Sequence, residues 1–384
     1  MLLAYDNLII DVDSDDAEDL EWLAEFLCPS FSRLDIATSR AADCRIRLVR
    51  DPASFERWHE RLHSADPLRT RAFLLDTGPV ELATFSEDDA FIAHDDFFHV
   101  FFRWSPAMGQ CNVEIVDRHP EHSAEATRPR RARVPLMRAV REWAMHHSLR
   151  RGRIFLHAAA IVRNGNAVLL AGPKRSGKTS LLTASLRDRA DIAYLANDRV
   201  MVSRLDRGWR CRGVPSIVSV RPGSMEFLPG IEGRLRTVAS GHTSRSTATK
   251  APVAFADGRI GLSPPQFCRL VGAQPVAEAG LTAIVFPRIS TTAASVDIRA
   301  LSGPEAVERL TEAVFGRTGV GGPSALFDVV DSGVYPDPAA RTAAAARLAN
   351  DVLCLDVGLG PDAYQPGVID GLLGRLFVSQ GDSR

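Results

Sequence analysis

One stretch of the sequence constrains this chain more than any other: AVLLAGPKRSGKTSLL, residues 167–182. It contains the pattern G-x-x-x-x-G-K-[ST], with Gly172, Gly177, Lys178 and Thr179 at the fixed positions. An apolar run precedes the loop and a helical pattern follows it, which is the context that the pattern requires. Because such a loop joins a buried strand to a helix, the sequence predicts an α/β domain around it.

The chemistry of this loop follows from its residue types. Glycine lets backbone N–H groups turn toward a bound anion, and the start of the following helix adds its positive dipole end. We expect Lys178 to neutralise the β- and γ-phosphates of ATP and the Thr179 hydroxyl to bind Mg²⁺. The alternative is a glycine-rich turn without a ligand. The predicted nucleotide-binding residues of this Walker A loop are Gly172, Pro173, Lys174, Arg175, Ser176, Gly177, Lys178, Thr179 and Ser180.

Composition excludes several classes of protein. Hydrophobic residues make up 45% and charged residues 24% of the chain, as in ordinary globular domains, and the net charge of -1 offers no field for nucleic acid. No run approaches the roughly 18 apolar residues of a membrane helix, and no signal-peptide pattern begins the chain. The six cysteines are scattered without zinc-type spacing, as is typical of reduced thiols. We therefore expect a cytoplasmic protein whose partners include neither nucleic acid nor a membrane.

The pattern of apolar runs predicts two domains. Residues 1–125 alternate strand-like runs with helical patterns at 17–27 and 54–62, and we interpret them as an α+β accessory domain, with acceptor recognition as the hypothesis for its role. Residues 126–134 belong to a basic, proline-containing segment, which we interpret as a linker; a basic patch for an acidic substrate or partner is the alternative. Residues 135–384 form the predicted nucleotide-binding domain.

Within this second domain the periodicity predicts alternating helices and strands. The Ser/Thr-rich segment 240–250 is expected to be mobile. The predicted helices span 135–150, 178–187, 303–315, 338–348 and 368–376, and the predicted strands span 154–161, 167–171, 192–195, 209–220, 282–286 and 352–357.

Two further residues have the right chemistry near the loop. Asp198 lies twenty positions after Lys178, at the end of the apolar run IAYLA. A carboxylate at the C-terminal end of a strand next to the loop would bind Mg²⁺ or an attacking hydroxyl, whereas the alternative is an Asp-initiated turn. His157 lies in the apolar run RIFLHAAAIV, where a histidine is more often a hydrogen-bonded core residue than a functional one.

From His157 to Val202 the chain resembles the HPr kinase/phosphorylase superfamily, which is related to the ATP-dependent phosphoenolpyruvate carboxykinases. The stretches that carry the resemblance are LHAAAIVRNGNAVLLAGPKRSGKTSLLTASL and YLANDRVMV. Members show a histidine in the strand before a β-hairpin, then the phosphate loop, then an acidic pair followed by Arg-Val or similar. The likeness extends more weakly over about residues 135–360, through CRGVPSIVSVRPGS, AIVFPRIS and the helix from Gly303. It implies a P-loop kinase domain in which His157 positions the acid or the acceptor.

The chain departs from this family at two places. The acidic pair is Asn197-Asp198 here, and an amide cannot accept a proton near neutral pH. Either Asp198 serves both as base and on the metal side, or the acceptor is activated differently, or catalysis is slow. The Arg-Gly-Leu-Gly signature of true HPr kinases is absent, since the corresponding region reads VSVRPGS. The chain is therefore similar to HPr kinase-like relatives instead, which include serine kinases of lasso-peptide precursors and enzymes acting on small hydroxyl compounds.

Together these residues predict a kinase. The expected reaction transfers the γ-phosphoryl group of Mg-ATP to a serine of a peptide or protein, or to a small hydroxyl compound, with Asp198, His157 and Lys178 as catalytic residues and Thr179 and Asp198 on the metal. Further candidates for substrate or phosphate contacts are Asn197, Arg212, Arg221, Lys250 and Arg288.

Two other classes of function are kept open. A nucleotide-binding switch or scaffold with weak or lost phosphotransfer would explain the amide at position 197, and Asn197→Asp would then leave transfer absent instead of raising it. A carboxykinase-like enzyme would need additional cationic and metal-binding positions that the sequence does not reveal. By analogy with the relatives, which are often oligomeric, a homo-oligomer is kept open.

Overall fold

The computed structural model describes residues 1–35, 41–64, 69–75, 78–87, 90–95, 98–107, 110–118, 132–220, 253–254, 260–290, 295–316 and 334–377. Helices and mixed β-sheets make up these residues, so the predicted α/β class is confirmed. The chain forms two compact units, one built on Met1–Arg150 and one on Arg151–Gly322 with Tyr335–Arg384. Among the described residues, no helix is long and apolar enough to cross a membrane.

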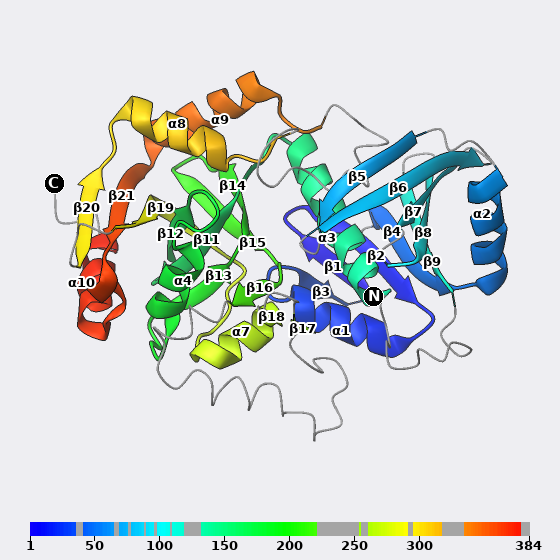
Figure 1. The fold of residues 1–384 in the computed structure, drawn as a ribbon, viewed down its shortest axis with the longest axis horizontal. Helices are drawn as coiled ribbons and strands as arrows, with labels where there is room; N and C mark the ends of the chain where they lie inside the picture. The colour runs from blue at the N-terminus through cyan, green and yellow to red at the C-terminus, as the bar shows by residue number, and fades with distance from the viewer. Residues whose placement is uncertain are drawn as a thin grey trace. The chain divides into compact units, whose positions relative to one another are not determined.

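The first unit is built on a nine-stranded sheet with the order β3-β1-β2-β4-β9-β8-β7-β6-β5 (Figure 1). β2, β4 and β9 pair in parallel, and the other neighbours are antiparallel. The strands are β1 (Leu2–Tyr5), β2 (Leu8–Ser14), β3 (Ser32–Leu34), β4 (Cys44–Arg50), β5 (Arg69–Leu75), β6 (Gly78–Glu87), β7 (Ala90–Asp95), β8 (Val100–Ala107) and β9 (Gln110–Asp117). Its helices are α1 (Ala17–Leu27), α2 (Pro52–Ser64) and α3 (Arg133–Arg150).

Helix α3 belongs to this first unit, which corrects the sequence-based assignment of residues 135–150 to the second domain. It packs against α1, β2 and β4. At its start, Arg133 Nε lies 2.5 Å from Oδ1 of Asp19, a fully buried carboxylate whose other oxygen is 2.5 Å from Arg50 Nη2. A buried carboxylate requires such partners, and these two arginines tie α3 to α1 and β4.

The second unit is built on a sheet with the order β10-β14-β15-β19-β12-β11-β13, with β21 beside β19 and β20 beside β21. β12, β19 and β21 are parallel. The strands are β10 (Ile154–Leu156), β11 (Ala158–Arg163), β12 (Asn166–Ala171), β13 (Ala193–Ala196), β14 (Arg199–Arg204), β15 (Trp209–Val214), β19 (Glu278–Ile289), β20 (Val296–Ala300) and β21 (Leu353–Leu359). A separate three-stranded sheet holds β16 (Val218–Val220), β17 (Val253–Ala254) and β18 (Ile260–Leu262).

Helices cover both faces of this sheet (Figure 1). Val168 and Leu170 of β12 face the core under α4 and α10, whereas Ala167 and Leu169 face the core under α8 and α9. Successive strand residues point to opposite faces, so a strand covered on both sides reads as the continuous apolar run seen in the sequence. The helices are α4 (Lys178–Leu186), α7 (Pro264–Val271), α8 (Gly303–Ala313), α9 (Pro338–Asp351) and α10 (Pro366–Leu376), with a 3₁₀ turn η3 (Pro361–Tyr364).

Two predicted strands are interrupted in the structure. The strand expected at 154–161 breaks at His157 into β10 and β11. The strand expected at 209–220 breaks at Pro215 into β15 and β16, because proline lacks the N–H that a β-ladder needs. Helix α7 and strand β20 were missed. Most of the predicted linker 126–134, the segment 240–250, Arg221 and Lys250 lie outside the described residues.

Candidate functional site

The predicted phosphate loop joins β12 to α4 and adopts a backbone that depends on its glycines. Gly172 has φ 139° and Gly177 φ 101°, which are conformations that L side chains rarely adopt. A Cβ on Gly177 would lie 3.1 Å from Cδ1 of Ile289 and 3.3 Å from Cδ1 of Leu359. The ends of β19 and β21 therefore pack directly on the first turn of α4 and fix where the loop enters the helix.

Lys178 lies folded over this loop. Its Nζ donates hydrogen bonds to the backbone oxygens of Gly172, at 2.7 Å, and Pro173, at 2.9 Å, and the residue is 8% exposed. Burial lowers the pKa of Lys178 from its ordinary 10.5 to about 8, although the charge of Asp198 acts in the opposite direction. A desolvated ammonium whose hydrogen bonds within the described residues go to backbone carbonyls is a strong binding group for an anion.

Other loop groups also suit an anion. Ser176 Oγ is buried and has no hydrogen-bond partner among the described residues, which is unusual for a native hydroxyl. Gly177 gives α4 no side-chain cap, so the first N–H groups of the helix remain for a ligand. The side chains of Pro173, Lys174 and Arg175 are exposed at the tip.

Strand register brings His157 and Asp198 to this loop. Ala158 pairs with Ala171, the residue before Gly172, and Ala160 pairs with Ala196 on the other side of β11. The backbone N–H of Ala158 donates to the carbonyl oxygen of Asp198 at 3.1 Å. β11 thus separates β12 from β13, and the two functional candidates meet at the end of the sheet where the loop begins.

Asp198 is held between two basic side chains. Its Oδ1 lies 3.1 Å from Nδ1 of His157, and its Oδ2 lies 3.5 Å from Nε of Arg199. Burial alone would raise the pKa of the Asp198 carboxyl, but His157 together with the charges of Arg199 and Lys178 outweighs it and holds the pKa well below its usual range. Asp198 is therefore a stable anion at neutral pH.

Phe315, which follows α8, supports both neighbours of Asp198. The His157 ring meets it edge-on with centroids 6.4 Å apart, and the Arg199 guanidinium lies 5.7 Å from its centroid. The backbone N–H of His157 donates to Ala313 at 2.8 Å, and that of Phe315 donates to Phe155 at 2.9 Å. Sequence reasoning missed Phe315, which no local pattern marks, whereas Arg199 was marked only by following Asp198.

Asn197 has a structural partner. Its Nδ2 donates to the carbonyl oxygen of Ile217 at 3.2 Å, and the residue is 9% exposed. A carboxylate at this position would have no proton to donate and would face that oxygen with like charge. The amide is therefore required by its surroundings, which gives a physical reason for the departure from an acidic pair.

The two described arginine candidates differ in position. Arg212 pairs with Glu278 at the start of β19, beside the start of β12 and so at the end of the sheet away from the loop. The structure therefore corrects the expectation that Arg212 contacts phosphate. Arg288 does lie at the loop end of β19, but its Nε is 2.8 Å from Oδ2 of Asp356, a carboxylate that also pairs with Arg309 at 2.9 Å.

A metal site would have to use few protein ligands. Among the described residues, no group of three or more His, Cys, Asp and Glu side chains is arranged to hold a metal ion. Mg²⁺ commonly takes only one or two protein ligands and completes its shell with phosphate oxygens and water. The Thr179 hydroxyl at the start of α4 and the ionised Asp198 are the kind of oxygen donors that fit this pattern.

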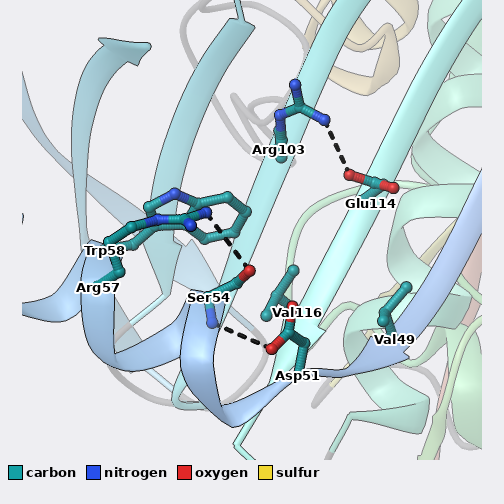
Figure 2. Close-up of a pocket in the computed structure, with 8 residues that line it drawn as sticks. All are labelled: Val49, Asp51, Ser54, Arg57, Trp58, Arg103, Glu114 and Val116. Carbon is teal, nitrogen blue, oxygen red and sulfur yellow. Dashed lines mark hydrogen bonds and ion pairs between the residues drawn. The ribbon is translucent and has the colours of Figure 1, made fainter. Parts of the chain in front are cut away.

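The first unit holds a separate pocket of about 390 Å³ (Figure 2). Its polar groups pair with one another: the N–H of Ser54 donates to Asp51 at 3.1 Å, and Arg103 lies 3.1 Å from Glu114. The pocket is lined by Val49, Asp51, Ser54, Arg57, Trp58, Arg103, Glu114 and Val116.

In comparisons with known proteins, no family model and no curated protein matches this chain. What the chain does is therefore inferred from the chemistry at the loop end of the second sheet. That end gathers a desolvated cation in Lys178, a stable anion in Asp198 and an imidazole in His157. This combination can bind an oxyanion and act on a group transferred from it.

Proposed function

We propose that this chain is an ATP-dependent phosphotransferase whose second unit is a P-loop kinase domain of the HPr kinase type. The observation that carries the proposal is the convergence of Lys178 with the His157–Asp198 pair at one end of one sheet. A phosphate loop alone supports nucleotide binding. An imidazole–carboxylate pair beside it supports transfer, because a reacting group needs partners next to the phosphate that is moved.

Each residue of the site has a distinct role in this proposal. The N–H groups at the start of α4 and the unpaired Ser176 Oγ bind phosphate oxygens, and Lys178 exchanges its loop carbonyls for the β- and γ-phosphates. Mg²⁺, when bound by Thr179 and Asp198, neutralises negative charge that develops on the phosphates. Catalysis then consists mainly of positioning and electrostatic stabilisation, which the close approach of β19 and β21 to Gly177 supports.

The acceptor in this proposal is a hydroxyl group. The resemblance described above suggests two kinds of acceptor. One is a serine of a peptide or protein, such as a ribosomally made precursor, and the other is a small hydroxyl compound. The position of Asp198, between His157 and Arg199 and in the field of Lys178, supports an acceptor that approaches the end of β13.

The test begins with binding. Titration of the purified chain with Mg-ATP is compared with Lys178→Met and with Arg163→Gln, a control that removes one positive charge from a surface pair with Asp191 in the same unit. We expect the Lys178 variant to bind at least roughly tenfold more weakly, since a hydrogen bond to a charged group contributes about 1.5–3 kcal/mol, and the control to bind like the wild type. Equal binding by all three proteins would refute the assignment of the loop.

Transfer is tested in the same samples with γ-labelled ATP and candidate precursor peptides or a cell extract. A labelled acceptor that is lost with Lys178→Met supports the phosphotransferase. Binding without a labelled product in any condition supports the second candidate, a nucleotide-dependent switch. The observation favouring that candidate is the Asn197 amide, which is bonded to Ile217 and cannot act as a base.

A further inference from the structure

The orientation of His157 distinguishes its two ring nitrogens. Nδ1 lies 3.1 Å from Oδ1 of Asp198. Because this nitrogen faces an anionic carboxylate, the charge of Asp198 favours the neutral tautomer with its proton on Nδ1 and a lone pair on Nε2. No described residue forms a hydrogen bond with Nε2. This is the arrangement in which a carboxylate fixes the tautomer and direction of an imidazole so that the other nitrogen can react.

The other groups beside the loop are poorly suited to react with phosphorus or to take a proton. Asn197 is a neutral amide whose Nδ2 donates to Ile217. The two oxygens of Asp198 face His157 and Arg199. Nε2 of His157 therefore carries a lone pair for which no described residue supplies a hydrogen-bond partner.

His157 is also held next to the phosphate loop. It precedes Ala158, which pairs with Ala171 at the end of β12, and the Lys178 ammonium lies 2.7 Å from the carbonyl oxygen of the next residue, Gly172. Contacts with Ala313 and Phe315 fix its backbone and its ring, and its side chain is 16% exposed. A fixed nucleophile that is mostly shielded from water can carry a phosphoryl group without losing it to hydrolysis.

We infer that His157 is a phosphoryl relay: Nε2 takes the γ-phosphoryl group of ATP and passes it to the acceptor hydroxyl. This inference rests on the proposed phosphotransferase function. It assigns that function a covalent enzyme intermediate and two transfers in place of one direct transfer.

The bonds balance in both steps. In the first step the Nε2–P bond forms while the bond from the γ-phosphorus to the β–γ bridging oxygen breaks, and ADP leaves with that electron pair. The Nδ1 proton stays against Asp198, whose charge balances the positive imidazole ring. In the second step the acceptor oxygen forms its bond to phosphorus, the Nε2–P bond breaks, its electron pair returns to Nε2, and the hydroxyl proton leaves to solvent.

The experiment needs no acceptor. The full chain is incubated with Mg-ATP labelled on the γ-phosphate, and the product is digested and examined by mass spectrometry. We expect a label on the peptide containing His157 that is lost in acid and kept in base, as a phosphoramidate is. In a second assay, radiolabelled ADP is added to the chain with unlabelled Mg-ATP. Label should appear in ATP, because the phosphorylated enzyme can return its phosphoryl group to the labelled ADP.

Variants separate the relay from mere binding. His157→Gln should lose both the label and the exchange while its Mg-ATP affinity, measured by titration, is unchanged, and His63→Gln on the exposed side of α2 should behave like the wild type. Asp198→Asn should slow labelling by roughly 10²–10⁴-fold, as loss of the orienting carboxylate does in related triads. If the Gln variant fails to fold, Phe315→Leu keeps the imidazole and should slow labelling at unchanged affinity.

Each contrary result has a definite meaning. Transfer to an acceptor with neither label nor exchange would overturn the relay and leave the phosphotransferase standing. An acid-stable label, or labelling that persists in His157→Gln, would also overturn it. Absence of Mg-ATP binding in the wild type would remove the proposed function and the relay together.

Discussion

Lys178→Met offers the sharpest test of the phosphate loop, because the structure indicates that this lysine destabilises the free protein. Its ammonium is 8% exposed and its partners among the described residues are the backbone oxygens of Gly172 and Pro173. The fall of its pKa from 10.5 to about 8 corresponds to a cost of roughly 3 kcal/mol, at about 1.4 kcal/mol for each pKa unit. Methionine has a similar length and carries no charge, so it avoids this cost.

The sign of the pH dependence follows from proton binding. Below about pH 8 both folded and unfolded states hold the Lys178 proton, and the folded state bears the full cost. Between about pH 8 and 10.5 only the unfolded state holds it, so the stability of the wild type rises with pH across this interval. The variant should therefore be more stable than the wild type by about 1–3 kcal/mol near pH 7, after allowing for the two lost hydrogen bonds, and this difference should vanish toward pH 10.5.

The assay is urea unfolding of the full chain with hydrogen exchange of peptides from β12 and α4 as the local readout. The difference between the two proteins isolates Lys178, because other titrating groups are common to both. Saturating Mg-ATP should reverse the order, since a ligand at 100 times its dissociation constant stabilises by about 2.7 kcal/mol. A variant that is less stable at neutral pH, with a difference that does not change between pH 8 and 10.5, would refute the reasoning.

Three further outcomes follow from the same site. Asn197→Asp should lower the unfolding free energy by about 1–3 kcal/mol without raising phosphotransfer, because its carboxylate would face the Ile217 carbonyl. Thermal unfolding and transfer assays check this, and faster transfer by the variant would contradict it. Gly177→Ala should lower the unfolding free energy by about 1–3 kcal/mol and abolish Mg-ATP binding, since φ 101° and the 3.1 Å approach of Ile289 both oppose a Cβ. Calorimetry that finds intact Mg-ATP binding would count against the loop geometry. Phe315→Leu should keep Mg-ATP affinity but reduce transfer at least roughly tenfold, because His157 and Arg199 lose their shared aromatic contact; unchanged turnover would show that the ring is only a core residue.

How far the site could be predicted from the sequence depended on how local its signals are. The phosphate-loop pattern is a continuous stretch, and the helix predicted after it is present from Lys178, with Gly172 and Gly177 at positive φ. The role predicted for the lysine stays a prediction. His157 was ambiguous in the sequence, because only the register of Ala158 with Ala171 places it beside the loop. Such register is set by long-range pairing, which local periodicity does not encode.

The misses have the same origin. Phe315 reaches His157 because residues 313–315 pair with β10, and Arg212 faces away from the loop because β15 runs antiparallel to β19 from Glu278. Helix α3 was assigned to the wrong domain because its apolar positions predict a buried face without saying what covers it. The amide of Asn197 became interpretable only when Ile217, far along the chain, was seen to accept from it.

The break between β10 and β11 has a mechanical consequence. Leu156 pairs with Val200 and Ala160 with Ala196, so the register is the same on both sides of a gap that contains His157 and Asp198, and it shifts only beyond Ala160. His157 and Asp198 therefore lie between two successive strand pairs, β10–β14 on one side and β11–β13 on the other. A nucleotide bound there would contact both strand pairs. It would therefore lower the frequency of local opening in β10 and β14 as well as in β11 and β13, and the two pairs would open together instead of separately.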